Sequence, residues 1–373
     1  MLALAVSAAI ALTTMSSGQS ASQNVFLTDR YRVELRVPSE GVFAGEEVDI
    51  EFRVGDRKQD DPILGPAGVP EVKAVAVITM PSMAGMPSAK PKIHAEGVPG
   101  DYGIEAFFPH GGEYAIRLDL TVPDGEKFTA KFLVNVQDEG QKGRKPKAKP
   151  YRLEAAQTDG TLRLKVLESK SGKAVTDFDV AHEQKLHLLV ASSDFTWFVH
   201  EHPVMQADGT WEMPFKFPYG GNYFVYADVA PAGKGSQILM APVRIPGVAP
   251  KRAESWNQNL GPSSAEGVNA RLILPADGIP VGRSVPVTFR LNDPATDQRI
   301  TDLTPWLGAM GHLMIFRQDG LTAVHSHPDE VPTQTGEIRF NVRFPKSGNY
   351  RAFGQVQRNE KILTFSFTIQ VKE

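Results

Sequence analysis

The heptapeptide FPYGGNY, residues 217–223, decides the fold, because related copies occur in each third of the chain. The other copies are FPHGGEY at 108–114 and FPKSGNY at 344–350. Proline interrupts ladder pairing and glycine permits positive φ, so each copy predicts a strand ending at Phe, a turn, and a strand beginning near Tyr. A tyrosine at this place is typical of the tyrosine corner of β-sandwiches. Three copies at domain-sized intervals therefore predict three related modules.

Short alternating or β-branched segments lie between these turns, and no segment shows the period of a long amphipathic helix. Examples are YRVELRV, EVDIEFRV, LRLKVLE, ARLILPA and FSFTIQV. Many short strands separated by turn residues favour an all-β fold. We expect three tandem immunoglobulin-like, or cupredoxin-like, β-sandwich modules at residues 25–137, 151–246 and 268–373, with linkers at 138–150 and 247–267.

The composition limits both chemistry and location. The 373-residue chain has no cysteine and a net charge of −3. Disulfide scaffolds, thiol catalysis and cysteine-ligated zinc are thereby excluded, and the charge gives no reason to expect a nucleic-acid partner. Residues 1–24 join an apolar run to small residues, which predicts a cleaved signal peptide and a periplasmic or secreted protein without a stable membrane span. An uncleaved membrane anchor is the alternative.

A three-histidine pattern occurs twice, in LHLLVASSDFTWFVHEHP and in GHLMIFRQDGLTAVHSHP. In both copies thirteen positions separate the first histidine from a His-x-His pair, and a proline follows. Neutral imidazole is the commonest protein ligand for copper, zinc and nickel, so each copy predicts a metal site. The candidate ligands are His187, His200 and His202 in the second module and His312, His325 and His327 in the third.

The spacing also predicts how these histidines meet. Residues two apart on a strand share a face, so each His-x-His pair should project together toward the first histidine on the neighbouring strand of a hairpin. We expect one cluster per module, at the edge of each sandwich. Asp194, Asp319 and Asp228 are candidate ligands or orienters of imidazole, with turn aspartates as the alternative for the first two. Ordinary hydrogen-bonded histidines are the alternative to metal ligands.

The first module lacks this pattern and has MPSMAGMP, residues 80–87, at the comparable place. Its prolines exclude a helix, so Met80, Met83 and Met86 should lie in a loop able to turn several thioethers inward. Thioether sulfur selects Cu(I), and His94 and His110 could complete such a site. The first module would then prefer reduced copper, and the other two a divalent metal. Methionine as apolar filler of the core is the alternative.

At these residues the chain resembles a known family. AVAVITMPSMAGMP and PGDYGIEAFFPHGGEYAIRLDL, within residues 33–136, resemble the YtkA-like domain. That domain is related to FixH-like domains, so the resemblance implies an immunoglobulin-like sandwich in an exported bacterial protein with copper or heavy-metal associations. The later modules resemble His-rich exported domains found beside it, the third through PWLGAMGH, residues 305–312. The chain departs from the family by lacking cysteine and any transporter or ATPase segment.

No nucleophile elbow, P-loop, H-E-x-x-H or dinucleotide fingerprint occurs in the sequence, so we expect no enzymatic activity. We expect an exported protein that binds a transition metal, copper or else zinc, for sequestration, buffering or delivery to a periplasmic partner protein. The main alternative is a structural or interaction protein built of tandem sandwiches. A weaker alternative is an enzyme with a mononuclear metal centre.

Overall fold

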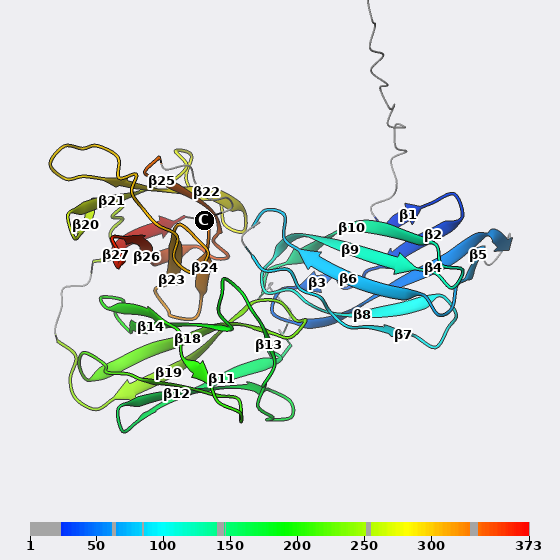
Figure 1. Ribbon diagram of the computed structural model, residues 1–373, viewed down its shortest axis with the longest axis horizontal. Helices are drawn as coiled ribbons and strands as arrows, with labels where there is room; N and C mark the ends of the chain where they lie inside the picture. The colour runs from blue at the N-terminus through cyan, green and yellow to red at the C-terminus, as the bar shows by residue number, and fades with distance from the viewer. Residues whose placement is uncertain are drawn as a thin grey trace, which may run out of the picture.

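The chain forms three β-sandwiches, each made of two sheets (Figure 1). The computed structural model describes residues 24–61, 65–83, 86–139, 145, 147–250, 255–328 and 335–372, and these contain strands and turns but no helix. The predicted all-β, immunoglobulin-like fold is confirmed. Within the same ranges no helix is long and apolar enough to cross a membrane. The predicted signal peptide lies outside the described residues.

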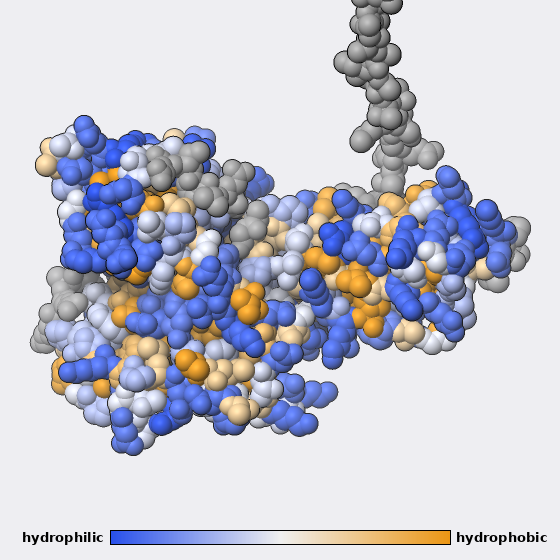
Figure 2. Space-filling view, viewed as in Figure 1, coloured by the Kyte–Doolittle hydropathy of each residue, from blue (hydrophilic) through white to orange (hydrophobic). Residues whose placement is uncertain are grey.

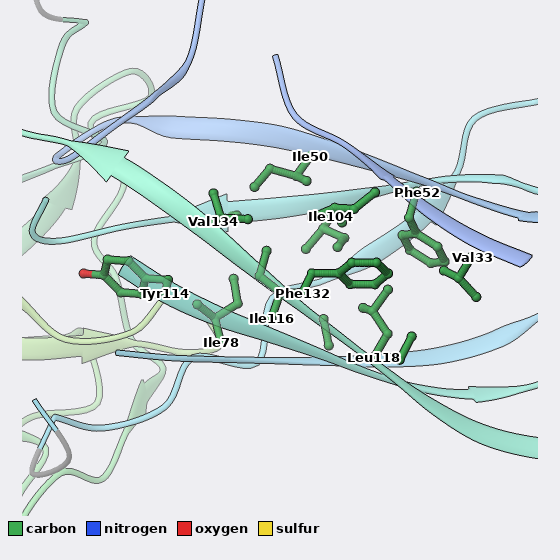
Figure 3. Packing of buried hydrophobic residues seen from close by; sticks show 14 of the residues in the cluster. Val33, Ile50, Phe52, Ile78, Ile104, Tyr114, Ile116, Leu118, Phe132 and Val134 are labelled. Carbon is green, nitrogen blue, oxygen red and sulfur yellow. The ribbon is translucent and has the colours of Figure 1, made fainter. Parts of the chain in front are cut away.

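The first sandwich packs a six-stranded sheet against a four-stranded one. The larger sheet has β1 (Val25–Leu27), β2 (Tyr31–Arg36), β4 (Glu47–Asp61), β8 (Asp101–Phe107) and β7 (Ile93–Ala95), with β5 (Gly65–Gly68) beside β4. The other has β3 (Val42–Phe43), β10 (Lys127–Gln137), β9 (Gly112–Thr121) and β6 (Lys73–Thr79). Figure 3 shows side chains of the two sheets pointing toward one another, among them Phe52, Ile104 and Phe132.

The second and third sandwiches share one plan. The second pairs β11 (Tyr151–Thr158), β12 (Thr161–Glu168), β17 (Thr210–Pro214) and β16 (Val204–Met205) with β13 (Phe178–Asp179), β18 (Gly221–Pro231), β14 (Leu186–Ser192), β15 (Phe198–Glu201) and β19 (Gln237–Ile245). The third pairs β20 (Ser263–Ala265), β21 (Val268–Ile273), β22 (Ser284–Asn292) and β25 (Glu337–Arg343) with β24 (Ala323–Ser326), β23 (His312–Arg317), β26 (Gly348–Arg358) and β27 (Lys361–Val371). Strand β20 lies inside the segment expected to be the linker 247–267, so the third sandwich begins earlier than predicted.

The repeated heptapeptide occupies the same place in all three sandwiches. Each copy has glycine at positive φ at the start of a strand, with the tyrosine two residues later and buried. The Tyr223 and Tyr350 hydroxyls donate to the carbonyl oxygens of Tyr219 and Lys346, four residues earlier, at 2.7 and 2.6 Å. The Tyr114 hydroxyl accepts instead from the His110 amide at 3.3 Å. A tyrosine corner therefore occurs at the equivalent turn of each sandwich, as the repeat predicts.

The second and third sandwiches face each other through the sheets that contain β14 and β23 (Figure 1). All of β14 is buried, because Leu186, Leu188 and Val190 enter its own core while Leu189 and Ala191 contact the third sandwich. The contact is largely aromatic, and it includes Phe198 stacked on Phe353 with ring centroids 4.5 Å apart. Figure 2 shows hydrophilic residues over most of the visible outer surface of the third sandwich. Inside this surface, Met314 and Phe316 of β23 pack against the second sandwich.

The tyrosine corners predict a measurable contribution to stability. Replacing Tyr223 or Tyr350 by Phe removes a partly buried hydrogen bond to the preceding turn without changing ring packing. Each change should lower the free energy of unfolding by about 1 kcal/mol. Urea denaturation of the two variants beside the parent protein measures this. Tyr114→Phe is the matched comparison and should cost less, because its hydroxyl accepts one longer hydrogen bond. Equal losses in all three variants would contradict this account.

Candidate metal centre between the second and third sandwiches

The six patterned histidines meet in one cluster rather than two. The rings of His187 and His325, from different sandwiches, lie 5.2 Å apart, as do those of His200 and His325. His187, His200 and His202 form the group expected for the second sandwich, but the expectation that each cluster lies separately at the edge of its own sandwich is wrong. It failed because the sheets that carry the histidines pack face to face, so the two sets share one buried space.

The hairpins place the histidines as the spacing predicts. His187 lies on β14 and His200 on β15, and His202 follows that strand directly. In the third sandwich β23 and β24 hold the equivalent positions. Asp194 and Asp319 lie in the turns of these hairpins, where Asp194 accepts from Thr196 and Asp319 from the Leu321 amide. Both are turn aspartates at the far end of the hairpin from the histidines.

The outer nitrogens of four rings are held by oxygen acceptors. His187 Nε2 lies 3.0 Å from the Ala181 carbonyl oxygen, and His312 Nε2 lies 2.9 Å from that of Trp306. His200 Nδ1 lies 3.2 Å from Gln355 Oε1, and His325 Nδ1 lies 2.8 Å from Asp228 Oδ2. Donation through these outer nitrogens fixes the tautomer, so the other nitrogen of each ring has its lone pair directed into the cluster.

The inner nitrogens of the first set have the separation that a metal ion requires. His187 Nδ1 lies 3.2 Å from both His200 Nε2 and His202 Nε2. An ion about 2.0–2.1 Å from each ligand places tetrahedral nitrogens roughly 3.3 Å apart. A second group, His200, His312 and His325, also offers nitrogens within 4.8 Å of one another. The residues present therefore suit a transition metal that accepts imidazole.

Burial keeps five of the six rings neutral, which ligation requires. Desolvation, with the neighbouring His325 second, lowers the pKa of His187 to about 3 and that of His202 to about 4. The same cause holds the pKa values of His200, His312 and His327 well below 6.5. For Asp228, burial opposes ionisation, but the hydrogen bond and charge of His325 outweigh it, so the pKa of the carboxyl is lowered. The cluster thus joins neutral imidazoles at His187, His200, His202, His312 and His327 to one buried carboxylate, Asp228.

The methionine loop of the first sandwich borders the same cavity. Met83, Met86 and His110 line a cavity of about 40 Å³ together with His187, His325 and His327. Met80 and Met83, 2% and 7% exposed, both lie in the core of the first sandwich, and Met86 packs against that core, as the filler alternative describes. Met83 and Met86 also line the cavity, whereas Met80 is not among its lining residues. His94 lies on β7 beside Asp49 and Glu96, outside this cavity.

Three residues at the centre were missed by the analysis of the sequence. His182 stacks on His327 with centroids 3.5 Å apart, Trp306 lies 4.8 Å from His312, and Gln355 orients His200. His182 occupies a two-residue turn at positive φ, and Leu307 holds the equivalent position in the third sandwich. Because the third sandwich has leucine at this position, comparison of the two repeats does not single out His182. The sequence PWLGAMGH, which entered the prediction only through the family resemblance, contains the equivalent turn of the third sandwich.

The fold and the cluster define a class: tandem immunoglobulin-like sandwiches with a histidine-rich centre between two of them. More than half of the chain, residues 149–243 and 263–373, matches one family model, and the chain belongs to that family, described as Domain of unknown function (DUF8832). Residues 27–119 match the YtkA-like family, which confirms the resemblance of the first sandwich. A search of the curated proteins finds no match.

Solved structures of other multi-module β proteins show distant similarity. A tetra-tandem repeat from the extending region of a large adhesion protein is 12% identical, with 92% of this chain and 75% of that chain covered and a TM-score of 0.22. A putative membrane anchored protein from Corynebacterium diphtheriae is 9% identical, with 91% and 89% covered and a TM-score of 0.21. The assignment of three sandwiches follows from the strand pairing in this chain and does not depend on these similarities.

The lowered pKa values predict acid sensitivity of the metal-free protein. Histidines titrate near 6.5 when unfolded but near 3 to 4 at positions 187 and 202, so between these values the unfolded chain binds more protons. Stability should therefore fall as the pH drops from about 6.5 toward 4. Thermal unfolding of metal-stripped protein across this range measures it, and saturating Zn(II) should delay the loss because metal competes with protons. A melting temperature constant from pH 7 to 4.5 would contradict the assignment.

Proposed function

We propose that this chain is an exported transition-metal-binding protein, with copper as the favoured metal, that sequesters, buffers or delivers the ion. The observation that carries the proposal is the set of inward-facing imidazole nitrogens between the second and third sandwiches. His187, His200 and His202 supply three nitrogens at ligand spacing, and oxygen acceptors hold the outer nitrogens of His187 and His200. Support for export comes from the signal-like residues 1–24 and the YtkA-like first sandwich.

Unpartnered nitrogens favour this function over a purely structural one. His312 Nδ1, His325 Nε2 and His327 Nε2 are buried and have no hydrogen-bond partner among the described residues. Each such atom costs about 1–3 kcal/mol if nothing binds it. The aromatic contact that includes Phe195, Phe198 and Phe316 would hold the two sandwiches together without any histidine. A bound cation would give each of these three nitrogens a partner.

Copper is favoured over zinc by the methionine sulfurs at the cavity. Zinc takes thiolate, imidazole and carboxylate, whereas thioethers select Cu(I). Met83 and Met86 border the cavity that the imidazoles line, and this chain has no cysteine to supply thiolate. We therefore place reduced copper at a shared imidazole and thioether centre, in place of the separate Cu(I) site and divalent sites expected from the sequence. Binding without turnover, and release to a periplasmic partner protein, complete the proposal.

Replacing one central histidine in each set tests metal binding. His200→Gln combined with His325→Gln removes a ligand from both candidate groups, while the amide keeps an N–H donor for Gln355 and Asp228. Loss of orienting residues alone costs metal sites about 10–100-fold in affinity, so loss of these ligands should lower affinity by more than about 100-fold. Competition with chromogenic chelators for Cu(I) and Zn(II) measures it. Asp319→Asn, in a hairpin turn at the far end from the histidines, is the control, and unchanged affinity in the double variant would overturn the proposal.

The methionine loop has its own test. Met83→Leu with Met86→Leu is nearly isosteric, so stability should change by less than about 1.5 kcal/mol. Cu(I) affinity should fall while Zn(II) affinity stays constant, because only Cu(I) gains from thioether ligands. Met80→Leu, in the core, is the matched control and should leave both affinities unchanged. Full Cu(I) affinity in the double variant would remove the methionines from the centre and leave the imidazoles alone.

A further inference from the structure

The halves of the centre that the second and third sandwiches contribute are related by an approximate two-fold symmetry. In the strand register His187 lies opposite Asp228, and His312 lies opposite Gln355. His325 of the third sandwich reaches Asp228 of the second, while His200 of the second reaches Gln355 of the third. Each sandwich thus orients a histidine of the other from the equivalent position, as in an isologous dimer interface.

The turns before the first histidines repeat the same relation. Ala181 pairs with Gln184, and Trp306 pairs with Ala309, in two-residue turns with positive φ at both central positions. In each, the carbonyl of the first turn residue accepts from the first histidine of that sandwich. Both sets therefore have matching backbone supports as well as matching ligands.

The inner nitrogens of the two sets correspond by position, but the first set is the more closely spaced. His187 Nδ1 lies 3.2 Å from His200 Nε2 and from His202 Nε2, whereas His312 and His325 reach a separation within 4.8 Å in a group with His200. The equivalents of the first-set nitrogens are His312 Nδ1, His325 Nε2 and His327 Nε2, the buried nitrogens without a partner among the described residues. Ring spacings also agree: 4.8 to 5.3 Å in the first set and 4.4 to 5.8 Å in the second.

We propose that the centre holds two metal ions, one bound by His187, His200 and His202 and the other by His312, His325 and His327. This rests on the metal-binding function proposed above and deepens it. A single ion held by His200, His312 and His325 would leave His187, His202 and His327 without use. Two ions employ all six imidazoles, and the buried carboxylate of Asp228 offsets part of their charge. Repulsion between neighbouring cations makes the second ion bind more weakly than the first.

Metal stoichiometry of the full chain tests the pair. Protein loaded with Cu(I) under reducing conditions, then freed of weakly bound ions, should contain two ions per chain. His202→Ala and the symmetry-related His327→Ala should each contain one, whereas Asp319→Asn, in a hairpin turn at the far end from the histidines, keeps two. Circular dichroism and melting temperatures confirm folding of each variant. Loading with Cu(II) gives an independent readout, since two neighbouring spins should give a dipolar-broadened spectrum in the parent that sharpens in His327→Ala.

The outcomes separate the pair from the underlying function. One ion per chain, lost in His200→Ala but kept in His202→Ala and His327→Ala, would overturn the pair and leave a single mixed centre. An isolated-spin spectrum of fully loaded parent protein would overturn it as well. Absence of any bound ion would overturn the proposed function itself.

Discussion

The structure depends on two strands, β14 and β23, that are buried on both faces. One face of each completes the core of its own sandwich, and the other meets the neighbouring sandwich. Each strand begins that second face with a histidine and continues it with apolar residues, such as Leu189 after His187 and Met314 after His312. Apolar burial along the strands thus encloses imidazoles that would otherwise face water, and hydrogen bonds at their outer nitrogens offset the cost of that burial.

Duplication of one module explains how the centre arises, and one difference between the copies sets its electrostatics. Where the second sandwich has Asp228, the third has Gln355, so one orienting group is a buried anion and the other a neutral amide. The two sets therefore differ in charge, since a buried anion orients His325 and a neutral amide orients His200.

The fold could be predicted from the sequence because its signals are local. A Phe-Pro turn, a glycine and a buried tyrosine act within seven residues, and hairpin spacing fixes which histidines share a face. The joint cluster could not be predicted by that reasoning, because the spacing of residues within a hairpin does not show which module packs against its outer face. One signal was present: LLVA at 188–191 and LMIF at 313–316 are unbroken apolar runs that follow a histidine, unlike the alternating YRVELRV. In an antiparallel sheet such a run indicates burial on both faces, and hence a contact between modules.

The first sandwich contributes position more than ligands. Asp138, at the end of its last strand, forms two hydrogen bonds of 2.5 and 2.6 Å with Arg343 of the third sandwich. Lys234 of the second lies 3.4 Å from Glu105 of the first. These charged contacts hold the methionine loop against the cavity, with Met83 and Met86 at its border. Flexible thioethers adapt to a space whose walls rigid imidazoles already define. The contacts of the first sandwich with the second and the third therefore suffice to place Met83 and Met86 at the cavity.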